Sequence, residues 1–96
     1  MPQRSAVLPA PELFEDQVAQ PGDWMVVVFD NDFNTFDEVI GILQKATGCS
    51  LEEAQMETWE VHHLGRSIVH YGEKPECDRA AAIITTIGIR VAVERL

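Results

Sequence analysis

The apolar residues of this chain fall into blocks with either strand-like or helix-like spacing. Residues 24–29 are six apolar residues in a row, three of them valine, which predicts a short buried strand. Residues 36–46 place apolar side chains at intervals of three and four, which predicts an amphipathic helix. Thr35 and Glu38 stand in the positions of a capping box at its start, and Gly48 predicts its end.

A second helix and a second strand follow from the same kind of signals. Ser50 and Glu53 again match a capping box, and Gly65 predicts the end of the helix that they begin. Residues 68–71 then predict a strand, which Gly72 closes. The buried face of the second helix is expected to carry Leu51, Ala54, Thr58 and Val61. Its acidic residues predict a solvated face, and they are Glu52, Glu53, Glu57 and Glu60.

The last part of the chain predicts a third helix and a third strand. Pro75 suits the first turn of a helix, and Gly88 predicts its end. Its apolar stripe is expected to be Ala80, Ile83, Ile84 and Ile87. Residues 89–94 alternate apolar and polar side chains and predict a strand. The order β-α-α-β-α-β predicts a small two-layer α/β domain of the α+β type, with a three-stranded sheet and its helices on one face.

The N-terminal residues differ in composition from the rest of the chain. Residues 1–22 hold four of the five prolines and only scattered apolar side chains. They predict a flexible arm, and residues 23–96 predict a single folded domain. No repeat or low-complexity run divides that domain further.

Charge narrows the classes of partner. The chain has 16 acidic residues against 7 Lys and Arg, and Lys45 is the only base between Glu12 and Glu60. Such an acidic front half repels phosphate backbones, so we expect no nucleic-acid partner, whereas a cationic ligand or a basic partner surface fits. Plain solubility is an equally open interpretation of the same charge.

The sequence also indicates a compartment. No apolar run approaches the length of a membrane helix, and the N-terminus lacks a signal-peptide pattern. Cys49 and Cys77 do not form a C-x-x-C pair and are expected to be reduced thiols. We therefore expect a cytoplasmic protein without a membrane partner.

The histidines and cysteines suggest metal or nucleophilic chemistry only weakly. His62 and His63 are adjacent and would point about 100° apart on a helix, and no closed four-ligand zinc set is present. We expect no metal and no cofactor. A small hydrolase that uses His62 or His70 with Cys77 stays open as an alternative, although no strained nucleophile turn supports it.

A more specific feature is the loop after the first strand. Asp30, Asn31 and Asp32 place acid and amide oxygens directly beside an apolar wall. Such residues often serve only the local backbone of a turn. The same arrangement also suits an apolar ligand that carries one positive group, because the oxygens accept hydrogen bonds while the wall contacts the apolar part.

Taken together, these segments resemble the Clp protease adaptor family, ClpS. The most specific parts are the Asx loop before the first helix and the sequence Val-His-His-Leu-Gly-Arg at 61–66. Residues 36–45, Ile68 and the third helix continue the resemblance, which covers about residues 24–96. Residues 1–22 are similar to the flexible arm of the family in length and position.

The resemblance implies an adaptor and not an enzyme. Members recognise the N-terminal residues of substrate proteins, the N-degrons, chiefly Leu, Phe, Tyr and Trp. They deliver these substrates to an AAA+ unfoldase, ClpA or ClpC, which feeds the ClpP peptidase. The main alternative is a ClpS-fold interaction module that binds an internal peptide segment or a single partner without N-degron specificity.

The resemblance also implies site residues. Asp30, Asn31 and His62 match the residues that bind the α-amino group, with the usual Asn-Asp order exchanged at the first two. The pocket for the first side chain is implied to comprise Asp32, Asn34, Thr35, Phe36, Thr58, Val61 and Ile89. Phe36 and Thr58 stand where the family usually has methionine. Glu76 and Arg79 are a weak match to the unfoldase-docking residues.

Overall fold

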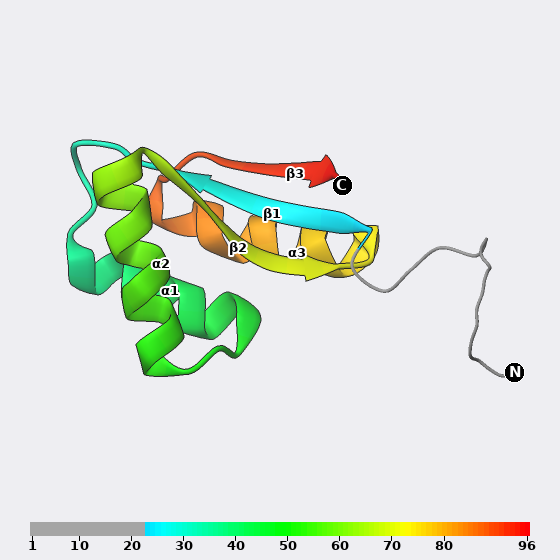
Figure 1. Ribbon diagram of the computed structural model, residues 1–96, viewed down its shortest axis with the longest axis horizontal. Coiled ribbons are helices and arrows are strands. Elements are labelled where there is room, and N and C mark those ends of the chain that lie inside the picture. Colours follow the sequence, from blue (N-terminus) through cyan, green and yellow to red (C-terminus); the bar gives the residue numbers. More distant parts are fainter. Residues whose placement is uncertain (1–22) are drawn as a thin grey trace, which may run out of the picture.

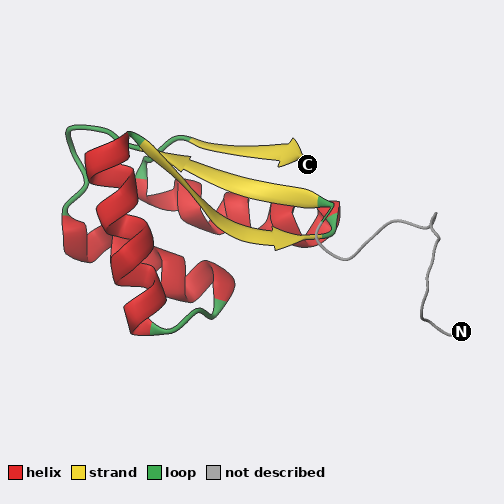
Figure 2. Ribbon diagram, in the orientation of Figure 1, coloured by secondary structure: helices red, strands yellow, loops and turns green. Residues whose placement is uncertain are grey.

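The computed structural model describes residues 23–96, and the predicted arm, residues 1–22, lies outside the described residues. The elements are β1 (Trp24–Phe29), α1 (Phe36–Thr47), α2 (Leu51–Leu64), β2 (Arg66–Gly72), α3 (Lys74–Ile84), the 3-10 turn η1 (Thr85–Ile87) and β3 (Val91–Arg95). Figure 2 shows them as one sheet with helices against it. The predicted element order is confirmed.

The sheet is antiparallel with β1 in the centre, in the order β2-β1-β3. α3 packs along β1 and β3, and α2 packs against β2, so that the helices cover one face (Figure 1). Phe29 at the end of β1 lies opposite Arg66 in β2, and Val28 lies opposite Val91 in β3. The predicted α+β class and two-layer arrangement are confirmed.

The core lies between the sheet and the helices. Its fully or almost fully buried apolar residues include Val26, Val28, Val39, Leu43, Ala54, Val61, Val69, Cys77, Ala80, Ile84 and Ile89. Leu51 was expected on the buried face of α2 but is half exposed, because it starts the helix at the edge of the molecule. The other three residues predicted for that face, Ala54, Thr58 and Val61, are buried.

A β-bulge changes the direction of the side chains in β2. Val26 lies opposite His70 and Val27 lies opposite Ile68, so Val69 is the extra residue on β2. Val69 is buried in the core and lines a cavity between β2 and α2. His70, next to it, lines the same cavity. Strict alternation along β2 would have placed one of these two side chains on the other face of the sheet.

The helix starts agree with the sequence, whereas the third helix ends differently. Thr35 accepts a bond from the backbone N–H of Glu38 and the Glu38 carboxylate accepts one from the backbone N–H of Thr35, as the capping box predicts. α3 ends at Ile84 and gives way to η1, where the Thr85 and Thr86 hydroxyls donate to backbone carbonyls three residues earlier. As a result β3 begins at Val91, two residues later than predicted, and Ile89 is buried outside the strand.

Candidate functional site

The loop between β1 and α1 is tied to two distant parts of the chain. The backbone N–H of Asp30 donates to the carbonyl of Gly65 at the end of α2, over 3.0 Å. The side-chain amide of Asn34 donates to the carbonyl of Ile87 in η1, over 2.8 Å. Figure 1 shows this loop at the end of the molecule where α2 ends and β3 begins. Elements far apart in sequence therefore hold the loop in place.

Asn31 organises the interior of the loop. Its side-chain oxygen accepts bonds from the backbone N–H groups of Phe33 and Asn34, at 3.1 and 3.0 Å. Its amide nitrogen donates to the side-chain oxygen of Asn34 at 2.8 Å and to the carbonyl of Gly88 at 3.5 Å. The structure thus shows the Asx-turn role that the sequence left open. Asp30 and Asp32, on either side of Asn31, are at the surface.

The start of α1 adds a carboxylate to the same region. Glu38 accepts bonds from the backbone N–H of Thr35 at 2.9 Å and from the side-chain amide of Asn34 at 3.2 Å. Both bonds favour the charged carboxylate and so lower the pKa of Glu38 below its ordinary value. The bond from the Thr35 backbone has the larger effect. Sequence analysis gave Glu38 only a capping role, yet it also bonds Asn34 of the loop.

His62 is held in a defined orientation on α2. Its Nδ1 lies 3.1 Å from the carbonyl oxygen of Thr58 one turn earlier. A carbonyl only accepts, so this hydrogen bond requires the proton on Nδ1 and leaves Nε2 of the neutral ring as an acceptor. The Phe36 ring lies against the imidazole, with centroids 5.1 Å apart and planes tilted by 48°.

The expected pocket residues divide into a buried group and an exposed one. Thr58 and Val61 are completely buried, and Ile89 is nearly so. The Thr58 hydroxyl donates to the carbonyl of Ala54 at 2.7 Å, so its hydrogen-bonding capacity is used within α2. Phe36 remains 38% exposed. Among the implied site residues, the structure shows side-chain contacts between Phe36 and His62 and between Asn31 and Asn34.

The two residues matched to the docking surface differ in their surroundings. Glu76, in the first turn of α3, accepts from Nε2 of His70 at 2.7 Å. Arg79 is exposed on the same helix. The sequence gave no indication that Glu76 pairs with a histidine of β2, because the contact depends on the position that the bulge gives to His70.

The remaining candidate chemistry is not assembled into a site. Among residues 23–96, no three His, Cys, Asp or Glu side chains are grouped so that they could hold a metal ion. Nδ1 of His63 bonds the carbonyl of Trp59, and the two rings stack with centroids 4.4 Å apart. Cys77 is fully buried, and burial, followed by the charges of Glu76 and Asp78, raises its pKa. A buried thiol of this kind is a poor nucleophile, which weighs against the hydrolase alternative.

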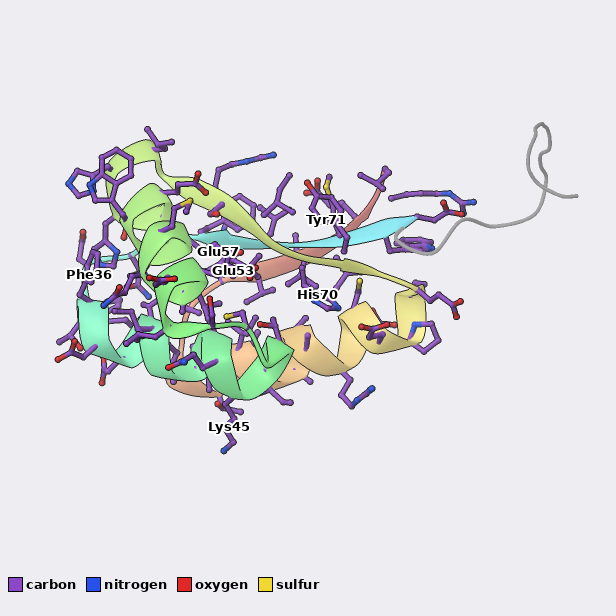
Figure 3. All side chains as sticks on the ribbon, turned by 60° about the horizontal axis from the view of Figure 1, so that its bottom comes forward. Phe36, Lys45, Glu53, Glu57, His70 and Tyr71 are labelled. Carbon is purple, nitrogen blue, oxygen red and sulfur yellow. The ribbon has the colours of Figure 1, made fainter. Side chains whose placement is uncertain are left out.

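A separate cavity of about 350 Å³ lies between α2 and β2. It is lined by Thr47, Cys49, Glu53, Glu57, Ile68, Val69, His70 and Tyr71. Figure 3 shows Glu53 and Glu57 near the middle of the molecule, with Phe36 at one end and Lys45 pointing away. The cavity is therefore distinct from the loop and His62.

Glu57 is the unusual residue of this cavity. Its Oε1 is buried without a hydrogen-bond partner in the described part of the chain. Burial, followed by a hydrogen bond to Glu53 and repulsion from Glu53 and Glu60, raises the pKa of Glu57 to about 8. The expectation of a fully solvated acidic face was therefore wrong at Glu57, because it lies on the side of α2 that faces β2.

Comparison with known proteins identifies the fold and the family. The sequence model of the family described as ATP-dependent Clp protease adaptor protein ClpS matches residues 19–90. The chain belongs to the ClpS family. A ClpS adapter protein from Rhodococcus opacus is 28% identical over 96 residues, which cover 99% of this chain and 86% of that protein.

Two further relatives extend the comparison. A 75-residue segment of the E3 ubiquitin-protein ligase UBR2 of Mus musculus is 37% identical and covers 76% of this chain, but only 4% of the ligase. The structure of Agrobacterium tumefaciens ClpS2 bound to L-phenylalaninamide matches with a TM-score of 0.73 at 17% identity, over 80% of this chain and all of that one. At that identity the structural match establishes the shared ClpS fold. Over residues 23–96, no helix has the length and apolar character that spanning a bilayer requires.

Proposed function

We propose that this ClpS-family protein binds the N-terminal residue of substrate proteins and delivers them to a Clp AAA+ protease. The observation that carries the proposal is the anchored loop of Asp30 and Asn31 beside an oriented His62 in a chain that matches the adaptor family. A neighbour of the same fold binds L-phenylalaninamide, a small molecule with a free α-amino group and an aromatic side chain. The proposed role is one of binding and not of catalysis.

The amine site would combine a charge with a directed acceptor. An α-ammonium group has three N–H donors, and carboxylate acceptors form charge-assisted bonds with it that are about twice as strong as neutral ones. Asp30 supplies the carboxylate at the surface. His62 supplies Nε2, because its Nδ1 proton is used by Thr58. Asn31 contributes mainly by holding the loop, since its side-chain oxygen already accepts two backbone bonds.

The pocket for the first side chain would open behind Phe36. Val61, Thr58 and Ile89 are buried and would form the wall of this pocket, and Phe36 is the partly exposed member of the set. A rotation of Phe36 away from His62 would uncover this wall to a ligand. Asp32, Asn34 and Thr35 lie in the loop before α1 and would form the rim of this pocket. Leu, Phe, Tyr and Trp are the expected first residues, because burying a side chain of that size contributes roughly 1.5–3 kcal/mol.

Delivery would use other parts of the chain. We propose an unfoldase of the ClpA or ClpC type, acting with ClpP, as the partner. Residues 1–22 would be the segment that the unfoldase engages, because an unfolded segment is easier for a translocating motor to grip than a folded domain. Glu76 and Arg79 would belong to the docking surface on α3.

A peptide array tests the proposal. It presents all amino acids at position one, each with a free and with an acetylated α-amino group. We expect binding of the free peptides that begin with Leu or an aromatic residue, and weaker binding of Val and Ile because branching at Cβ crowds the entrance. Equal binding of acetylated peptides would support the alternative module for internal segments. Equal binding of Val, Ile, Leu and Phe would contradict the proposed pocket.

A further inference from the structure

Two arginines share one aromatic ring at the end of β1. The guanidinium carbon of Arg90 lies 4.0 Å from the centroid of the Phe29 ring, and that of Arg66 lies 5.7 Å from it. Arg66 lies opposite Phe29 in the β-ladder, and the backbone N–H of Phe29 donates to the carbonyl of Arg90 at 3.0 Å. We call Arg66, Phe29 and Arg90 the arginine clamp.

The clamp is on the free face of the sheet. Side chains alternate along a strand, and Phe29 follows the core residue Val28, so its side chain points to the face of the sheet away from the core. Figures 1 and 2 show that the helices leave this face of the sheet uncovered. Both arginines are exposed. The ring fixes the plane of a stacked guanidinium and leaves its N–H groups directed outward.

The charges of the clamp are not neutralised within the described residues. The ion pairs between side chains of residues 23–96 are His70 with Glu76 and Lys74 with Asp78, and neither involves the clamp. This is unexpected in a chain with 16 acidic residues and 7 Lys and Arg. Two guanidinium groups held together without a carboxylate form a receptor for an anion, and a carboxylate matches their donors in a bidentate manner.

The clamp adjoins the proposed amine site through the backbone. Phe29 immediately precedes Asp30, and Gly65, which accepts the Asp30 N–H, immediately precedes Arg66. An extended chain advances about 3.3 Å per residue. A bound chain that leaves the amine site towards Arg66 and Arg90 would bring its second to fourth residues within reach of the clamp.

We propose that the arginine clamp binds the carboxylate of an Asp or Glu at position two, three or four of the bound substrate chain. The inference rests on the proposed function and adds to it a preference beyond the first residue. The source of the anion is the substrate itself, since only a residue of the bound chain is brought to the clamp by binding at Asp30.

Binding of matched peptides tests this inference. The parent peptide begins with Phe and carries Gln at positions two to four, and three further peptides replace one Gln by Glu. Affinities are measured at low salt for the wild type, for the double variant Arg66→Gln/Arg90→Gln, and for Arg95→Gln. Arg95 is the matched control, because it stacks on Trp24 at 5.3 Å at the opposite end of β1.

The wild type should bind at least one Glu peptide roughly 1.5- to 5-fold more tightly than the parent, which is the range for exposed ion pairs. The double variant should lose this preference and keep its affinity for the parent, and Arg95→Gln should retain the preference. Equal binding of the Glu and Gln peptides by the wild type overturns the inference. An equal loss in Arg95→Gln also overturns it, because the effect would then reflect net charge alone.

Acetylation of the parent peptide separates this inference from the proposed function. Binding that depends on the free amine but not on Glu contradicts the clamp alone. Binding that does not depend on the free amine contradicts the proposed function, and the clamp as part of it.

Discussion

The side-chain amide of Asn34 donates a 2.8 Å hydrogen bond to the carbonyl of Ile87, a residue 53 positions later in the chain. Asn34 lies in the loop before α1, and Ile87 ends the 3-10 turn before β3. The same amide also bonds the Glu38 carboxylate at 3.2 Å, so it connects the loop, the start of α1 and the 3-10 turn η1. Side-chain bonds of this kind fix where the candidate site lies relative to the sheet.

Removal of this amide should loosen the loop. Asn34→Ala leaves the Ile87 carbonyl without its partner and removes the shorter of the two bonds of the Asn31 amide, and we expect a loss of about 1–2 kcal/mol in the free energy of unfolding. Binding of Phe-initiated peptides should weaken as well, because Asp30 is no longer held in position. Urea denaturation and peptide titration measure the two effects. Gln55→Ala, which removes an exposed amide from α2, should change neither; an Asn34→Ala protein of unchanged stability would show that the bond does not hold the loop.

Glu57 should make the protein less stable as the pH rises. Its pKa is raised from 4.5 to about 8 by burial, so the folded state holds a proton that the unfolded chain releases between these values. The unfolded state binds fewer protons in this window, and the free energy of unfolding therefore decreases with rising pH. Glu57→Gln imitates the protonated form, so it should match the wild type near pH 5 and exceed it near pH 8.5. We expect a difference on the order of 1–2 kcal/mol, discounted for partial solvent access.

Thermal unfolding at both pH values measures this difference. Glu52→Gln is the control, because Glu52 is exposed on the same helix and its replacement should give the same change at both pH values. If the stabilities of the wild type and Glu57→Gln change in parallel between pH 5 and 8.5, the buried position of Glu57 is wrong.

Phe36 should limit the size of the first residue that the site admits. Its ring lies against His62, and Phe36→Ala removes this contact and widens the proposed entrance. In a competition assay, the ratio of the affinity for a Trp-initiated peptide to that for a Leu-initiated peptide should rise several-fold. Phe33→Ala provides the control, because Phe33 is 85% exposed in the same loop. An unchanged Trp-to-Leu ratio in Phe36→Ala would place the entrance elsewhere.

The arm should matter for delivery and not for recognition. Deletion of residues 1–20 removes none of the proposed site residues, so peptide affinity should stay at the wild-type value. Clp-dependent degradation of a Phe-initiated reporter should be lost, because the unfoldase would have no segment to engage. Degradation at the normal rate by the shortened protein would refute the proposed role of the arm, and a loss of peptide affinity would show that the arm contributes to binding.

The sequence predicted the elements well because local signals determine them. The valine-rich strand Trp24–Phe29 has the predicted bounds, and the caps at Thr35 and Ser50 start α1 and α2 as expected. Two features were not predictable from local pattern. The bulge at Val69 depends on pairing with β1, and the end of α3 at Ile84 depends on hydroxyl-to-carbonyl bonds of Thr85 and Thr86.

Only part of the candidate site could be predicted from the sequence. The Asx loop was identified from residue type and position, and His62 from the resemblance to the ClpS family. The partners that hold the loop, however, are backbone carbonyls of Gly65, Ile87 and Gly88. Every residue has a backbone carbonyl, so the pattern of side chains does not indicate which carbonyl will accept a bond from the loop. The burial of Glu57 was missed for a related reason, because much of its surroundings comes from β2, which is separated from it in sequence.

The central claim is that the α-amino group of the ligand is recognised at Asp30. Fluorescence anisotropy with one Phe-initiated peptide, free and acetylated, tests it in the wild type, in Asp30→Ala and in Asp37→Ala. Asp37 is an exposed acid in the first turn of α1, so its variant has the same change in net charge. Acetylation removes the charge of the α-ammonium group and Asp30→Ala removes its counter-charge, so each change should cost on the order of 2–4 kcal/mol of binding. The Asp37→Ala protein should bind normally, and Asp30→Ala should be less sensitive to acetylation than the wild type because His62 still offers an acceptor. Equal binding of the free and acetylated peptides by the wild type would contradict the account.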